Sequence, residues 1–241
     1  MEIIKCSSKR EEILQTLTDK SVTKQIVYEN TKEALDLIKE RLLSLYEFLS
    51  PKLSDKHKNL LVNYYDRSEF EAEFKLASDI LVFNMHSNIF NFEKTHDIWR
   101  TSYVKEDNSR AYCGVIHVYN FLADSFKYQR MNDMGFLVAR IFVNKDKHFF
   151  IEGKKQMGLL FNDFCNSEIS KAKMCLIVET AVNYCLNFDL ISPPYEDIEM
   201  VTVDEMFEAF SNMKMKTSKK MGFKFSGSSE ENFKKNNDFY L

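Results

Sequence analysis

Hydrophobic positions three and four residues apart dominate residues 1–78, and this spacing predicts helices with one buried side. The stretch "NTKEALDLIKERLLSLYEFLSP" is predicted to begin at a capping Asn30 or Thr31 and to stop at Pro51. Its leucine seam consists of Leu35, Ile38, Leu42, Leu45 and Leu49. The seam spans about two heptads, fewer than the three to four of a typical coiled-coil dimer, so it favours packing within the chain. "KREEILQTL", "SDKHKNLLVNYY" and "SEFEAEFKLAS" predict further helices.

The pattern changes at Asp79, where β-branched and aromatic residues gather in short runs separated by polar turns. The predicted strands are "ILVFNMHSNIFNF", "IWRTSYVKE", "RAYCGVIHVYNFL", "GFLVARIFVN" and "KHFFIEGK". Connections this short cannot make parallel crossovers, so the strands predict a mainly antiparallel meander of about five strands. Helical spacing then returns in 154–164, 167–188 and 202–213. The expected fold is α+β, with helices packed on one face of the sheet.

Three parts follow from these patterns. Residues 1–78 are expected to form a helical extension that packs on the core, and residues 79–213 an α+β sheet domain with C-terminal helices. Residues 214–241 are rich in Lys, Phe, Gly, Ser and Asn, which predicts a flexible basic and aromatic tail. The order of helix, sheet and helix is similar to that of profilin-, roadblock-, PAS- or GAF-like sensor and adaptor domains, a likeness of fold alone.

Composition narrows the class of protein. Hydrophobic residues make up 44% of the 241, while there are only 6 Gly and 3 Pro, too few for a many-stranded sandwich or for most glycine-rich phosphate loops. The net charge of −3 argues against nucleic acid as a partner. No long apolar run predicts a signal peptide or a membrane span. Five widely spaced cysteines suit reduced thiols, so we expect a soluble cytoplasmic protein.

A polar row on the first predicted strand is the main candidate site. Alternation places Asn84, His86 and Asn88 on one face, opposite Leu81, Phe83 and Met85. A hairpin turn at 93–97 would add the next two strands to this face. The predicted ligand-binding set is therefore Asn84, His86, Asn88, Arg100, Ser102 and His117. Two interpretations stay open: a solvated sheet face, or a pocket, because Asn is rare on solvated strands.

An alternative chemistry lies in "NDMGFLVARIFVNKDKHFFIEGKKQMG". Asp133, followed by a hairpin and then Glu152 and Lys154, resembles the D…(E/D)xK core of metal-dependent nucleases. The resemblance implies two carboxylates on Mg²⁺ and a lysine beside the attacking water. Against it, Asp133 falls outside the paired part of the predicted hairpin. The histidines lack zinc-site spacing, so no resident metal is otherwise expected.

The sequence thus favours a non-catalytic ligand-binding or protein-interaction module of the sensor or adaptor kind, without a cofactor. Its expected partners are a small-molecule ligand, another protein, or a second copy joined through a sheet edge or the leucine seam. The alternative is a metal-dependent phosphodiester hydrolase.

Overall fold

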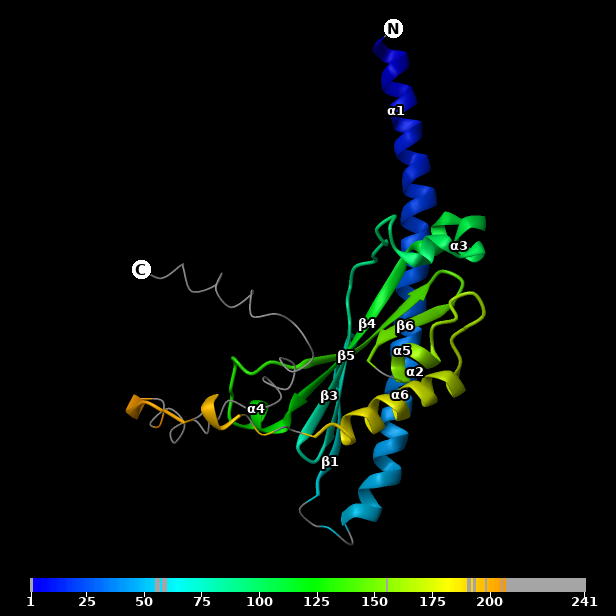
Figure 1. Cartoon of the computed structure of the whole chain (residues 1–241). Coiled ribbons are helices and arrows are strands. Elements are labelled where there is room, and N and C mark those ends of the chain that lie inside the picture. The colour runs from blue at the N-terminus through cyan, green and yellow to red at the C-terminus, as the bar shows by residue number, and fades with distance from the viewer. Residues whose placement is uncertain are drawn as a thin grey trace. The chain divides into compact units, whose positions relative to one another are not determined.

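The structure is a computed structural model, and it describes residues 2–54, 57, 60–154, 156–189, 192, 194–197, 199–204 and 206. The chain divides into two compact units: Met1–Ala123 with Gly135–Leu186, and Asp124–Met134 with Asn187–Leu241. The first unit contains the sheet and the long helices (Figure 1). Helix α4 (Ala123–Lys127) leads into the second unit, which also contains the short 3₁₀ helix η4 (Tyr195–Asp197).

Six antiparallel strands form one sheet in chain order, so every strand pairs with its neighbours in the sequence (Figure 1). Their bounds are β1 (Val62–Ser68), β2 (Glu71–Leu76), β3 (Asp79–Met85), β4 (Cys113–Leu122), β5 (Phe136–Asn144) and β6 (Phe149–Gly153). The predicted α+β class and antiparallel meander are confirmed. The strand count is six rather than about five.

The first two strands lie where the sequence predicted helices, so those two predictions are wrong. In β2, Ala72, Phe74 and Leu76 enter the main core while Glu71, Glu73 and Lys75 alternate with them on the other face. This period of two matches a half-buried strand. The helix-forming Glu, Lys, Ala and Leu residues in this stretch obscured it.

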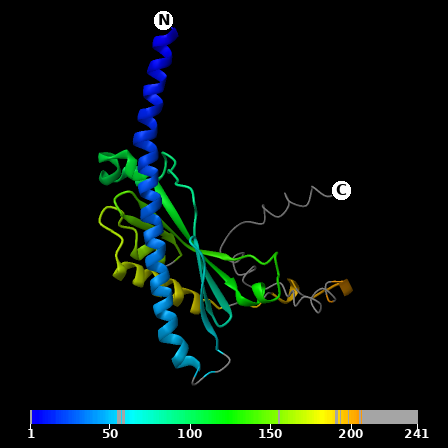
Figure 2. The ribbon, with the colours of Figure 1, turned by 180° about the vertical axis from the view of Figure 1, so that it is seen from behind.

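A continuous helix covers one face of the sheet, as both views show (Figures 1 and 2). It consists of α1 (Glu2–Thr16), the π-helical turn η1 (Leu17–Ser21) and α2 (Val22–Ser54). Leu35, Ile38 and Leu42 are fully buried in the core beneath it. The leucine seam therefore packs within the chain, as predicted. Helix α6 (Lys171–Leu186) contributes to the same core, and α5 (Gln156–Leu160) lies next to β6.

Asn30 and Thr31 do not cap a helix, because the helix begins well before them. The buried Asn30 side chain instead donates from Nδ2 to the carbonyls of Asn144 and Lys145, at 3.0 and 2.8 Å. Thr31 lies against Gly114 of β4, so closely that a Cβ atom on Gly114 would be 2.1 Å from Thr31 Oγ1. These contacts hold α2 at a fixed position on β4 and on the β5–β6 turn.

The opposite face, which we call the outer face, is partly covered by three helical turns: η2 (Asp97–Arg100), α3 (Ser102–Glu106) and η3 (Asn108–Ala111). They bury a second apolar cluster of Ile98, Val104, Ala111, Cys113, Val115, Phe142, Phe150 and Phe164. The predicted strand over 98–106 and its hairpin are therefore wrong. His96, Thr101 and Asp107 each accept a backbone N–H at the start of one of these turns, which stabilises helical rather than extended backbone.

The predicted C-terminal helix over 202–213 and the predicted tail from 214 lie outside the described residues, apart from 202–204 and 206. Within the described ranges, no helix is both long enough and apolar enough to cross a membrane.

Candidate functional site

One polar side chain from each of five neighbouring strands lies in a single line across the outer face. Backbone pairing sets Glu71 opposite Asn84, Asn84 opposite His117, His117 opposite Arg140, and Arg140 opposite Glu152. We call these five residues the polar row. Residues flanking them along the strands belong to the core beneath α2, so the row faces away from that helix.

Both carboxylates at the ends of the polar row already have partners. Asn84 Nδ2 donates to Glu71 Oε2 at 3.0 Å. At the other end, the guanidinium of Arg140 pairs with the Glu152 carboxylate, and His96 Nε2 lies 3.3 Å from Glu152 Oε1. The ends of the row are therefore held by side-chain contacts on the sheet itself.

His117, in the middle of the polar row, is different. Its ring stacks on that of Tyr119, with centroids 5.7 Å apart and planes at 21°. Within the described part of the chain, neither ring nitrogen has a hydrogen-bond partner. Partial burial, together with the nearby Arg140 and His86, lowers the pKa of His117. The imidazole is therefore neutral at pH 7, with one nitrogen that donates and one that accepts.

Apolar side chains flank the polar row on both sides along the strands. On one side lie three aromatic rings, Phe92, Phe142 and Phe150, whose centroids are 5.0 to 5.8 Å from one another. On the other side lie Val82 and Tyr119, which belong to or pack against a third apolar cluster. The middle of the row is thus a polar strip between two apolar borders, whereas at the β2 end the neighbour of Glu71 on the same face is Glu73, which pairs with Arg67.

The structure brings together part of the predicted ligand-binding set. Asn84 and His117 are paired neighbours in the polar row. His86 comes directly after β3, and it lies near enough to His117 to contribute to the lowered pKa of that imidazole. The remaining three predicted residues do not join them.

Asn88 is exposed in the loop after β3, where its N–H donates to His86 Nδ1 at 3.0 Å. Arg100 lies on η2, is 80% exposed and pairs with Asp97 at 2.9 Å, and Ser102 is exposed at the start of α3. Arg100 and Ser102 were assigned to the face through the predicted hairpin at 93–97, but helical turns occupy 97–106. Asn88 was assigned by alternation along the first predicted strand, but β3 ends at Met85.

The sequence prediction of the ligand-binding set did not include Glu71, Arg140 or His96. It named Glu152 only as a metal ligand of the nuclease-like alternative. Sequence patterns could have identified Glu71 and Arg140. Alternation in "EAEFKL" places Glu71 on the face opposite Ala72, and Arg140 is the only charged residue in the apolar run "FLVARIFV". The contact of His96 with Glu152 joins segments 56 residues apart and leaves no local signal.

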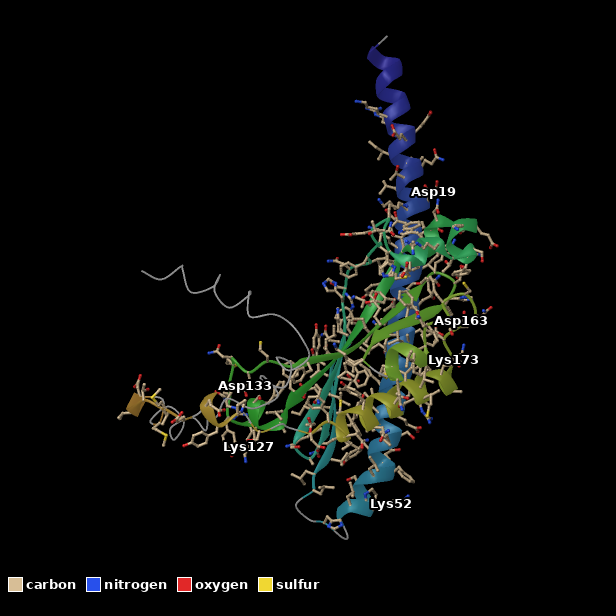
Figure 3. The ribbon with its side chains drawn as sticks, in the orientation of Figure 1. Asp19, Lys52, Lys127, Asp133, Asp163 and Lys173 are labelled. Atoms are coloured by element: carbon tan, nitrogen blue, oxygen red, sulfur yellow. The ribbon has the colours of Figure 1, made fainter. Side chains whose placement is uncertain are left out.

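The nuclease alternative gains no support from the positions of its residues. Asp133, in the second unit (Figure 3), pairs with Arg130 at 2.9 Å and accepts from Ser125 at 2.6 Å. Glu152 pairs instead with Arg140 in the first unit, and the exposed Lys154 follows β6. Among the described residues, no group of three His, Cys, Asp or Glu side chains could hold a metal ion.

Other catalytic pairings on the outer face are also poorly placed. Glu71 and Glu152 lie four strands apart, roughly 19 Å at the usual spacing of strands, too far to act on one bond. Cys113 is fully buried, and burial raises the pKa of its thiol well above the ordinary value.

Comparisons of the chain with protein-family models, curated proteins and solved structures found no match.

The lowered pKa of His117 predicts that acid destabilises the fold. In the unfolded chain the imidazole gains a proton near its ordinary pKa of about 6.5, while in the folded chain it does so only at lower pH. Between these two pKa values the unfolded state binds more protons, so stability falls as the pH falls. We expect His117→Gln to reduce the slope of unfolding free energy against pH below about pH 6.5, as measured by urea denaturation.

His57→Gln is the matched control, because His57 is exposed and lies outside the sheet. An acid slope that is equal in His117→Gln and in the wild type would show that other groups are responsible.

Proposed function

We propose that this chain is a non-catalytic binding module and that the polar row, with its apolar borders, is the surface that binds a small polar ligand. The observation that carries the proposal is His117: a half-buried, neutral imidazole in mid-row whose ring nitrogens are not used by the described fold. Polar groups that converge within an apolar rim are the usual composition of a ligand site.

The surroundings of His117 favour a particular chemistry of ligand. The neutral imidazole offers one donor and one acceptor, and the Asn84 amide beside it has a carbonyl oxygen as a further acceptor. The aromatic rings beyond the row would contact a flat apolar part of the ligand. A nucleoside or another planar heterocycle combines these features, so this is the class that we propose.

The same proposal places the module in a reducing, cytosolic compartment. Cys113, Cys165, Cys175 and Cys185 are all free thiols, and such thiols are maintained where glutathione and thioredoxin keep cysteines reduced.

A thermal-shift experiment tests the binding proposal with adenosine, guanosine, cytidine and uridine as probes. A ligand present at 100 times its Kd stabilises the native state by about 2.7 kcal/mol, which shifts the Tm of a chain of this size by several degrees. We expect at least one nucleoside to raise the Tm of the wild type and to have little effect on Asn84→Ala/His117→Ala.

The matched control is Asn63→Ala/Lys75→Ala, a pair on the same outer face at the other end of β1 and β2. This variant should keep the full shift. The proposal fails if no nucleoside shifts the wild type, or if the row variant responds as the wild type does.

A further inference from the structure

An apolar stripe runs along the part of the long helix that precedes its contact with the sheet. It consists of Ile13, Leu14, Leu17, Val22 and Ile26, whose exposed fractions are 59, 65, 56, 51 and 41%. Both views show this part of the helix extending past the end of the sheet (Figures 1 and 2). Five large apolar side chains on one short segment expose more than the scattered single residues of an ordinary surface.

The π-helical turn η1 is what aligns these residues. Ile13 and Val22 are nine positions apart, about 2.5 turns of a regular α-helix, which would set them on opposite sides. In η1 the hydrogen bonds run from residue i to i+5, so Leu17 and Val22 lie one turn apart on the same side. The four-residue steps Ile13–Leu17 and Val22–Ile26 extend the line in both directions.

The stripe faces away from the sheet. On the other side of the same helical segment, Lys20 and Lys24 lie over the Tyr112 ring, 5.9 and 5.8 Å from its centroid. One turn further along, Val27 and Thr31 are fully buried. The side that packs on the domain is thus already occupied, and the apolar stripe is a separate surface.

An exposed charged residue lies at each end of the apolar stripe, and the two charges are of opposite sign. Arg10 lies one turn before Ile13, and Glu29 lies one turn after Ile26. They are 19 residues apart, roughly 28 Å along the helix, so they cannot pair within one chain. In an antiparallel pair of identical helices each Arg10 would face the Glu29 of the other copy, whereas a parallel pair would set like charges together.

We propose that the apolar stripe docks antiparallel on the same stripe of a second copy of this chain. The two-fold symmetry places Leu17 against Val22, and Ile13 with Leu14 against Ile26, and it forms the Arg10–Glu29 contact twice. The partner is identified by the arrangement of charge: a stripe with a cation at one end and an anion at the other is complementary to itself when it is reversed.

Sedimentation equilibrium of the full chain tests the proposal over concentrations up to about 100 µM, a range that covers micromolar Kd values. The wild type should approach twice the 28.5 kDa mass of one chain. Leu17→Glu should stay at the mass of one chain and keep the far-UV circular dichroism spectrum of the wild type, because Leu17 is 56% exposed and belongs to none of the core clusters of the described residues. Leu43→Glu is the matched control: Leu43 is exposed on the same helix outside the stripe, and this variant should still form the dimer.

Charge exchange tests the antiparallel orientation. Arg10→Glu and Glu29→Arg alone should each weaken the dimer about tenfold, because each places like charges together twice. The double variant Arg10→Glu/Glu29→Arg should restore the wild-type Kd. A wild type that stays monomeric overturns the proposal, and so does a dimer that Leu17→Glu leaves intact. Failure of the double variant to regain affinity also overturns it. None of these results depends on nucleoside binding at the polar row.

Discussion

Replacing Gly114 by alanine is expected to lower the free energy of unfolding by about 3 kcal/mol, the upper part of the range for overpacked cores. Gly114 is a buried residue of β4, and the added Cβ would lie 2.1 Å from Thr31 Oγ1 and 2.8 Å from Thr31 Cβ. The side chain of Thr31 cannot turn away, because it is fully buried and its hydroxyl donates to the Val27 carbonyl at 2.6 Å. The helix itself would have to move. Equilibrium unfolding in urea measures the effect.

Two variants separate this close approach from a general effect of losing a glycine. The Cβ of Gly135→Ala would have atoms of the Phe121 ring as its three nearest neighbours, at 2.4 to 2.7 Å, and a partly buried ring can shift, so we expect a loss of about 1 kcal/mol. In a Thr31→Ala background, Gly114→Ala should cost clearly less than in the wild type, because two of the three clashing atoms are gone. Equal costs in both backgrounds would contradict the proposed clash.

Asn144→Ala is expected to destabilise the protein by a similar amount, about 3 kcal/mol. Asn144 is fully buried, and its Oδ1 accepts from the N–H groups of Asp146 and His148, both at 3.0 Å. Its Nδ2 donates to the Tyr103 hydroxyl at 3.0 Å. Alanine leaves two partly buried backbone donors in the β5–β6 turn without an acceptor, and such unmade hydrogen bonds carry most of the cost.

Asn166→Ala is the control for this second effect. Asn166 is exposed and, within the described part of the chain, its side chain bonds only to Asp163 in its own turn, so its loss should change the free energy of unfolding by less than about 0.5 kcal/mol. Tyr103→Phe should also cost less in the Asn144→Ala background than in the wild type, because the two side chains share a hydrogen bond. If the losses of stability from Tyr103→Phe and Asn144→Ala simply add, the hydrogen bond between the two side chains does not stabilise the β5–β6 turn.

The central part of the sheet could be predicted from the sequence because its signals are local. Strands β4, β5 and β6 are apolar runs, a short polar turn joins β5 to β6, and in β3 the polar Asn84 alternates with the core residues Phe83 and Met85. That alternation was enough to place Asn84 on one face, whereas His117 was assigned to the same face through the predicted hairpin at 93–97, which the structure does not contain. It was not enough to show that they are direct neighbours, because a 27-residue segment, 86–112, separates β3 from β4.

The remaining errors concern segments whose structure depends on distant partners. Trp99, Tyr103 and Val104 have the composition of a strand, but they pack onto the outer face as helical turns. Capping by His96 and Thr101 is a short-range signal that the strong β-propensity of the aromatic residues outweighed in the prediction. Of the five members of the polar row, only Asn84 and His117 were predicted to share a face, because the five residues come from five strands whose register only the folded sheet defines.

The order of the elements along the chain also determines when each becomes stable during synthesis. A meander gives every new strand a partner that has just been made. Helix α2 has the opposite position: it emerges before the sheet, and Leu35, Ile38 and Leu42 are covered by strands and by α6, which follow later. Until α6 leaves the ribosome, this helix carries an uncovered apolar side, which is the form in which nascent chains aggregate or bind chaperones. A helix that is made before the sheet is thus fully buried only after the last element of the core has been made.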